Sequence, residues 1–204
     1  MTGENRLARR PGRRPGTNET RPAILATARE SFAAHGYEKT TIRGIARRAG
    51  VDPALVHHFY GPKQELFRAS VADVLAPITD ALGAAAPGDD PGATAERLGT
   101  ALGSMWEREP TRGALLGALR SAVTSDTAAE LLRGIVQEKA VAVVAATTGQ
   151  PDAELRANLI GATVIGIAVA RHVLGVQPIA SLDADEVDAL LVGVVRHYLS
   201  DELV

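Results

Sequence analysis

The decisive stretch of this chain is residues 41–63, TIRGIARRAGVDPALVHHFYGPK. Thr41 can cap a first short helix, and Gly50 can supply a tight turn because glycine takes positive φ at little cost. Asp52 can cap a second helix, with Pro53 in its first turn, where a missing N–H does no harm. Two short helices joined in this way predict a helix-turn-helix, and Lys63 then begins another helix after a Gly-Pro break.

In a helix-turn-helix the second helix lies in the major groove of DNA, and here that helix is predicted over residues 53–60. Its spacing turns Val56 and Tyr60 inward and leaves a DNA-facing set: Pro53, Ala54, Leu55, His57 and His58. Apolar Ala54 and Leu55 suit thymine methyl groups, and His57 can bond a base edge or a phosphate. The alternative is a solvated histidine pair. A metal role is disfavoured because adjacent histidines on a helix point about 100° apart.

The first helix of the motif is expected to cross the DNA backbone. Its N-terminus at Thr41 offers free N–H groups to a phosphate, and Arg43 can clamp a phosphate or a guanine edge. Lys63 is expected to bind a phosphate from the start of the next helix. Upstream, an apolar stripe predicts a supporting helix over residues 20–35, ended by Gly36.

The charge distribution agrees with a DNA partner for the first part of the chain. Residues 1–70 contain 13 Lys and Arg against 6 Asp and Glu, whereas residues 71–204 contain 9 against 18. Residues 1–19 carry RRPGRRPG, and we expect this arm to be disordered when free and to place Arg13 and Arg14 in a minor groove. The alternative is a solvated tail.

The remaining chain is predicted to be helical, which makes the fold class all-α. Proline and glycine breaks divide it into helices near 63–76, 93–108, 111–121, 126–148, 152–174 and 184–201. The pairs Gly99/Gly103 and Gly113/Gly117 permit close helix contacts. The expected units are the arm (1–19), the DNA-binding domain (20–66) and a helical regulatory and dimerisation domain (67–204).

Two features that the sequence lacks exclude several classes of protein. The chain has no cysteine, so disulfides, thiol catalysis and cysteine zinc sites are excluded. The longest strongly apolar run, residues 159–170, is shorter than the roughly 18 residues that span a bilayer, and the arginine-rich start lacks a signal-peptide core. We therefore expect a soluble cytoplasmic protein with no membrane partner.

Residues 22–67, PAILATARESFAAHGYEKTTIRGIARRAGVDPALVHHFYGPKQELF, resemble the DNA-binding domain of the TetR/AcrR transcriptional regulators. The resemblance implies phosphate contacts from Thr41 and Lys63, a base or phosphate contact from Arg43, and backbone contacts from His58 and Phe59. Pro53, Ala54, Leu55 and His57 would form the base-reading face. Leu55 and His57 depart from the usual residues, so base preference does not transfer, and Phe59 lacks the hydroxyl of the usual tyrosine.

The same resemblance implies a homodimer and a small-molecule pocket. The dimer would use the last two helices, through Leu159, Ile165, Leu191, Val194 and Tyr198, with an ordinary buried helix pair as the alternative. The pocket candidates are Met105, Trp106, Arg112, Leu116, Arg120 and His172, each of which could instead be plain core or surface. The expected ligand is apolar with one anionic or polar end, met by Arg112, Arg120 or Arg171.

These features favour a dimeric repressor that binds a pseudo-palindromic operator and is released by a small molecule. An activator or a nucleoid-type protein is the alternative among DNA binders. From another class, an enzyme or carrier with an appended DNA-binding head is disfavoured, because no Ser/His/Asp, paired-carboxylate or metal arrangement stands out. We expect no catalytic residues, no metal and no cofactor.

Overall fold

The computed structural model describes residues 17–83, 90–138 and 152–200, and every regular element in these ranges is helical. The predicted all-α class is confirmed. The elements are α1 (Thr17–Lys39), α2 (Ile42–Ala49), α3 (Pro53–Tyr60), α4 (Lys63–Val74), α5 (Ala76–Gly83), α6 (Pro91–Glu107), α7 (Thr111–Thr124), α8 (Asp126–Val136), α10 (Ala153–Val169), the π-helical turn η2 (Ala170–Leu174), the 3₁₀ turn η3 (Ile179–Ser181) and α11 (Ala184–Ser200).

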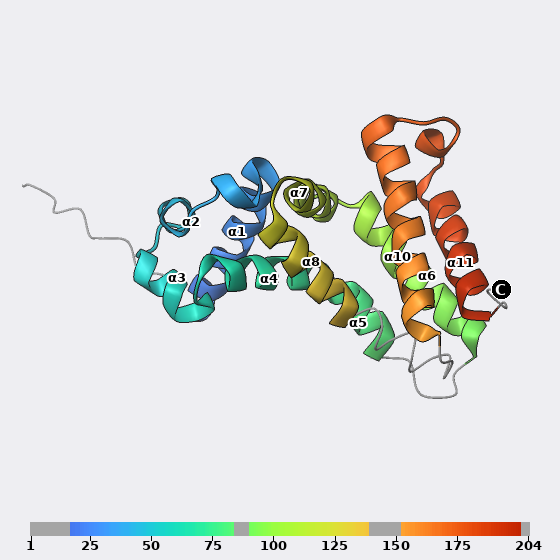
Figure 1. The fold of residues 1–204 in the computed structure, drawn as a ribbon, viewed down its shortest axis with the longest axis horizontal. Helices are drawn as coiled ribbons and strands as arrows, with labels where there is room; N and C mark the ends of the chain where they lie inside the picture. The colour runs from blue at the N-terminus through green and yellow to red at the C-terminus, as the bar shows by residue number, and fades with distance from the viewer. Residues whose placement is uncertain (1–16, 84–89, 139–151, 201–204) are drawn as a thin grey trace, which may run out of the picture.

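The helices are arranged from a head at one end to an upright helical bundle at the other (Figure 1). Helices α1–α4 form the head, α7 and α8 lie in the middle, and α6, α10 and α11 form the far end. One buried apolar cluster, which includes Ile24, Phe32 and Val56, joins the head to α7 and α8. A second cluster, which includes Trp106 and Leu191, fills the body. The apolar core of the head therefore continues into α7 and α8 of the body.

Glycine allows the helices to approach closely where the head meets the body and inside the body. A Cβ atom added at Gly117 of α7 would lie 2.5 Å from the Cα of Ala33 in α1. One added at Gly99 of α6 would lie 2.6 Å from the Cα of Val192 in α11. These distances are well below ordinary carbon contacts, so both crossings require glycine. Close contact at Gly99 and Gly117 is thus confirmed.

Several predicted helix boundaries differ from the structure. The helix expected to run from Lys63 to about residue 76 ends at Val74, and α5 follows with Pro77 in its first turn, where proline is tolerated. The helix expected over 111–121 continues to Thr124. The helix expected over 126–148 is described as far as Val136, and residues 139–151 lie outside the described residues.

The first helix also departs from the predicted 20–35. It begins at Thr17, and Gly36 (φ 73°, ψ 175°) breaks its helical geometry before a last turn that reaches Lys39. The break frees the Tyr37 N–H, which donates to Ser121 Oγ of α7 at 3.0 Å. Gly36 therefore bends α1 instead of ending it, and the Tyr37 N–H that the bend frees donates to α7 of the body.

Candidate nucleic-acid interface and effector sites

Local hydrogen bonds build the helix-turn-helix as its sequence predicts. Thr41 Oγ1 accepts from the Gly44 N–H at 3.0 Å and caps α2. Gly50 lies in the left-handed region (φ 69°, ψ 29°), which a residue with a side chain rarely adopts. Asp52 Oδ1 accepts from the Ala54 N–H at 2.8 Å and caps α3. Because both caps and the turn lie within twelve residues, this geometry is set mainly by local chemistry.

The outward face of α3 carries the residues predicted to read DNA. Val56 is fully buried, whereas Ala54, Leu55, His57 and His58 are exposed, with Leu55 at 39%. Pro53 is partly buried at the start of the helix. Phe59 is also partly buried and packs against the head core. The exposed set offers two apolar side chains and two imidazoles to a groove, and the structure directs Phe59 partly inward.

Two aromatic contacts hold the surroundings of α3 and α4 in place. Tyr60 donates its hydroxyl to the Arg21 carbonyl at 2.8 Å, and the Arg21 guanidinium lies 5.6 Å from the centre of the Tyr60 ring. Burial raises the pKa of Tyr60, although Arg21 partly opposes this shift. Lys63 Nζ lies 4.1 Å from the centre of the Tyr37 ring, a cation–π distance that orients the amine at the start of α4.

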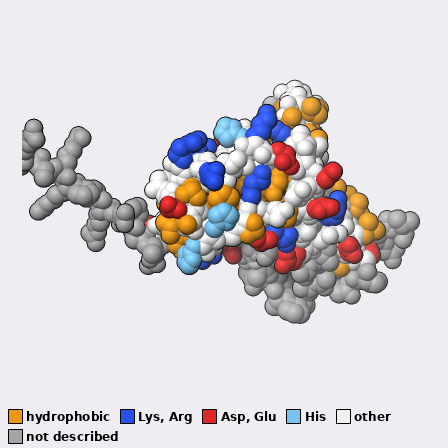
Figure 2. Space-filling view, turned by 60° about the vertical axis from the view of Figure 1, so that its left-hand side comes forward, with side chains coloured by type: hydrophobic (Ala, Val, Ile, Leu, Met, Phe, Trp, Pro, Cys, Tyr) orange, Lys and Arg blue, Asp and Glu red, His pale blue; other side chains and the backbone are white. Residues whose placement is uncertain are grey.

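The head surface carries basic groups that have no acidic partner among the described residues. Arg43 and Arg47 are exposed, and within the described chain neither lies in an ion pair. Arg48, by contrast, pairs with Glu30 at 3.1 Å. Figure 2 shows Lys, Arg and His side chains spread over the head, among apolar side chains. This surface suits a polyanion. The predicted contacts Arg13 and Arg14 lie outside the described residues.

An apolar cavity of about 150 Å³ lies in the body between α4, α5, α6, α7, α8 and α10. Met105 and Trp106 line it together with other apolar residues, including Leu102, Leu115 and Ile160. Two of the predicted pocket residues therefore meet here. No Arg, Lys, His, Asp or Glu is among the described residues that line it, so nothing ionic is present to meet a charged ligand.

The other pocket candidates lie elsewhere. Leu116 and Arg120 line a second hollow, between α1 and α7. Arg112 pairs with Glu109 at 3.0 Å, and His172 lies beside Glu107. Arg171, which was expected to meet the ligand's polar end, instead binds the same glutamate. The structure therefore separates the apolar candidates Met105 and Trp106 from all the charged ones.

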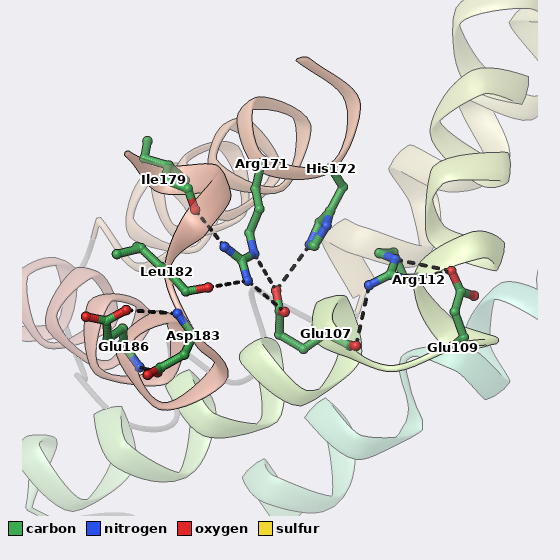
Figure 3. Close-up of polar contacts among 9 residues, drawn as sticks. All are labelled: Glu107, Glu109, Arg112, Arg171, His172, Ile179, Leu182, Asp183 and Glu186. Carbon is green, nitrogen blue, oxygen red and sulfur yellow. Dashed lines mark hydrogen bonds and ion pairs between the residues drawn. The ribbon is translucent and has the colours of Figure 1, made fainter. Parts of the chain in front are cut away.

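Glu107 is the centre of a polar cluster that ties α6 to η2 and η3 (Figure 3). Its oxygens accept from Arg171 Nε at 2.8 Å and Nη2 at 3.0 Å, and the same guanidinium donates to the Ile179 and Leu182 carbonyls. Burial alone would raise the pKa of Glu107, but the hydrogen bonds and the positive charge of Arg171 lower it below the ordinary value. Arg171 thus closes the loop between α10 and α11.

His172 sits at the edge of this cluster. Its Nε2 lies 3.2 Å from Glu107 Oε1 but is buried without a hydrogen bond. Burial lowers the pKa of His172, the charges of Arg112 and Arg171 lower it further, and Glu107 opposes both effects. The neutral imidazole is therefore favoured. Among the residues that the structure describes, no group of three or more His, Cys, Asp or Glu could hold a metal ion.

The predicted dimer residues divide between the core and the surface. Leu191 is buried in the body, Ile165 is exposed, and Leu159, Val194 and Tyr198 are partly buried. The Tyr198 carbonyl accepts from Arg156 Nη1 at 2.7 Å, a bond that joins α10 to α11 within one chain. Leu155 on α10 and Leu190 on α11 are exposed at 53% and 38%. This helix pair therefore presents apolar side chains outward.

Both parts of the chain match one protein family. Residues 24–70 match the bacterial regulatory proteins of the tetR family, and residues 92–199 match the tetracyclin repressor-like C-terminal domain. The chain belongs to the TetR family. It is therefore a DNA-binding transcriptional regulator and, like other TetR-family regulators, a non-enzymatic one.

Relatives of known description agree with the TetR assignment. An HTH-type transcriptional repressor from Mycobacterium tuberculosis is 32% identical over 126 residues, which cover 57% of this chain and 67% of the relative. A TetR-family regulator from Streptomyces coelicolor is 35% identical with a TM-score of 0.64, over 94% of this chain and all of that one. The SmeT–triclosan complex shares the fold, at 22% identity and a TM-score of 0.64, over 87% and 90% of the two chains.

Proposed function

We propose that this TetR-family regulator is a homodimeric repressor that binds a pseudo-palindromic operator and is released by a small molecule. The observation that carries the proposal is the capped α3 helix, which buries Val56 and leaves Ala54, Leu55, His57 and His58 exposed on a basic head. A helix so presented fits the major groove, where methyl contacts and histidine hydrogen bonds discriminate base pairs. The Mycobacterium tuberculosis relative is itself described as a repressor.

The outward face of α10 and α11 supports the dimer. The stretch Ala153–Leu174 has a mean hydropathy of 1.6 in its most apolar window, of which only 22% is buried within one chain. By length and composition alone it could also cross a membrane. A second copy of the same helix pair would cover Leu155, Ile165 and Leu190 by two-fold symmetry. We therefore favour a dimer interface, in a cytoplasmic protein, for this face.

Two-fold symmetry also sets the expected operator. A dimer with one α3 helix per head reads two half-sites about one turn of DNA apart, roughly 34–36 Å. The operator should then be an inverted repeat. The basic arm, residues 1–19, would add contacts to the minor groove beside each half-site.

The apolar cavity is the first candidate for the effector. Its volume of about 150 Å³ and its apolar lining, with Met105 and Trp106 side by side, suit a small neutral molecule without a charged end. Triclosan bound to SmeT is an example of a small ligand on the same fold. A ligand that prefers one head arrangement would lower operator affinity by shifting the population of arrangements.

Selection of bound duplexes from random DNA tests the DNA-reading part of the proposal. The purified chain should enrich an inverted repeat, and a Leu55→Ala, His57→Ala double variant should alter the enriched sequence. Repression is tested by placing the enriched sequence over a promoter, where the protein should lower transcription. Enrichment without repression would indicate an activator. Salt-sensitive binding to all sequences would indicate a nucleoid-type protein and contradict the proposal.

A further inference from the structure

A second hollow, larger than the apolar cavity, lies where the head meets the body. It is bounded by α1, the end of α2, α4, the connection before α7, and α7 itself, and its volume is about 490 Å³. We call it the α1–α7 hollow. Ligand pockets usually measure about 300–1,000 Å³ and combine apolar walls with a few convergent polar groups. The α1–α7 hollow lies inside that range, whereas the apolar cavity lies below it.

The walls of this hollow have the mixed chemistry of a ligand site. Apolar side chains of α1 and α7, among them Ala34, Ala114 and Leu116, line it beside the guanidinium groups of Arg48 and Arg120. Leu116 and Arg120 are one helical turn apart on α7, so they share a face. Two of the six residues that the sequence proposed for a ligand pocket, one apolar and one charged, therefore lie together here.

Among the residues that the structure describes, one arginine that lines the hollow has no acidic partner. Arg48 pairs with Glu30 at 3.1 Å, and Glu109 is held by Arg112 at 3.0 Å. Arg29, the third arginine of the lining, pairs with Asp73. Within the described part of the chain, the guanidinium of Arg120 makes only one hydrogen bond, from Nη1 to the Ala33 carbonyl at 3.4 Å.

The chemistry of this arginine decides the class of ligand. A guanidinium has five N–H donors, and it binds carboxylate-like groups through two parallel bonds. Arg120 is an exposed residue of the lining, and its other four donors stay available to a ligand. Because the acids of the lining are already neutralised by other arginines, an incoming anion meets a local excess of positive charge.

We propose that the α1–α7 hollow is an effector site for a small organic monoanion, a carboxylate or a sulfonate with an apolar body, and that Arg120 binds the anionic group. The site is separate from the apolar cavity. Its walls belong to α1, which carries the head core, and to α7, which carries the body. A ligand that touches both would stabilise one orientation of the head. Only this consequence for DNA rests on the proposed function, and binding itself can be measured without DNA.

Two matched dyes test the proposal on the full chain. Anilinonaphthalene sulfonate has an apolar body and one anionic group, and N-phenylnaphthylamine has the same body without the sulfonate. Fluorescence titration of the wild type should show one saturable sulfonate site per chain and at least tenfold weaker binding of the neutral dye. Arg120→Gln should weaken the sulfonate about tenfold, the usual scale of a lost charge-assisted hydrogen bond, whereas Arg120→Lys should retain part of the affinity.

Two control variants separate this site from other binding surfaces. Arg133→Gln removes the same charge from an exposed arginine of α8 that does not line the hollow, and it should leave sulfonate binding unchanged. Gly161→Leu fills the apolar cavity, where an added Cβ meets no atom within 4 Å, and it should also leave binding unchanged. Equal binding by the Arg120→Gln and Arg133→Gln variants would overturn the proposal, as would loss of binding in Gly161→Leu.

Discussion

The crossing of α1 and α7 couples the DNA-binding head to the body, and replacing Gly117 by Ala tests how tightly. The added Cβ would lie 2.5 Å from the Ala33 Cα and 3.2 Å from the Ala33 carbonyl oxygen. Carbon atoms in ordinary contact lie about 3.5–4.0 Å apart, so the two helices must separate by about 1 Å. Both atoms belong to backbone, and no side-chain rotation can relieve the contact.

A second glycine gives a matched control. Gly161 lies inside α10, as Gly117 lies inside α7, but a Cβ added there meets no atom within 4 Å. Both substitutions gain about 0.5–1 kcal/mol from the helix preference of alanine over glycine, so this term cancels in the comparison. Only Gly117→Ala adds the strain of overpacking, typically about 1–3 kcal/mol. The Gly117 variant should therefore be less stable than the Gly161 variant by about this amount.

Urea unfolding at one fixed protein concentration measures the difference, because the stability of a dimer depends on concentration. Operator affinity should also change in Gly117→Ala, since α1 moves relative to the body, and should stay unchanged in Gly161→Ala. Equal stability of the two variants, within about 0.5 kcal/mol, would refute the reasoning and would mean that the α1–α7 crossing yields without cost.

Four further outcomes are expected. Arg43→Gln should weaken operator binding and reduce the slope of log affinity against log salt by about 0.9, the value for one phosphate contact, and an unchanged slope would argue for a base contact only. Deletion of residues 2–16 should also weaken binding and flatten the salt dependence, and an unchanged slope would exclude the arm from the complex. Leu190→Asp should give monomers in sedimentation velocity, whereas Val123→Asp, at an 86% exposed position on α7, should stay dimeric; a dimeric Leu190→Asp would place the interface elsewhere. Burial and nearby arginine charges lower the pKa of His172 in the folded chain, so the unfolded chain binds a proton more readily as the pH falls. The wild type should therefore lose more stability than His172→Gln between about pH 7.5 and pH 5.5. Identical pH profiles of the two proteins would contradict this assignment.

The head shows how far local sequence can predict a site. The caps Thr41 and Asp52 and the turn at Gly50 act on atoms within three or four residues of themselves. They were therefore visible in the sequence and predicted α2, α3 and the exposed face of α3. The contacts that orient the neighbouring groups were not visible. Tyr60 bonds Arg21 across 39 residues, and Lys63 meets the Tyr37 ring from another helix.

The body, by contrast, could be predicted from the sequence only in part. Periodicity predicted that its segments are helical, but it could not sort Met105 and Trp106 into one cavity and Arg120 and Leu116 into another. An amphipathic pattern states which side of a helix is apolar, not which helix covers it. The sequence predicted a helix end near residue 76, close to the break between α4 and α5, but it did not predict α5 itself, because Pro77 is tolerated in a first helical turn and so marks a start as readily as a stop.

By itself the sequence determined that this chain is all-helical, that its first part carries a DNA-reading helix-turn-helix on a basic surface, and that glycine spacing permits close helix crossings. These features depend on short-range chemistry: caps, φ angles, helical periodicity and net charge. Only the tertiary structure decided which charges are neutralised. Arg171 meets Glu107 across 64 residues, whereas Arg120 lines a hollow and pairs with no acid among the residues that the structure describes. Pairing between distant side chains depends on how the helices pack, and that packing is decided by the whole core at once.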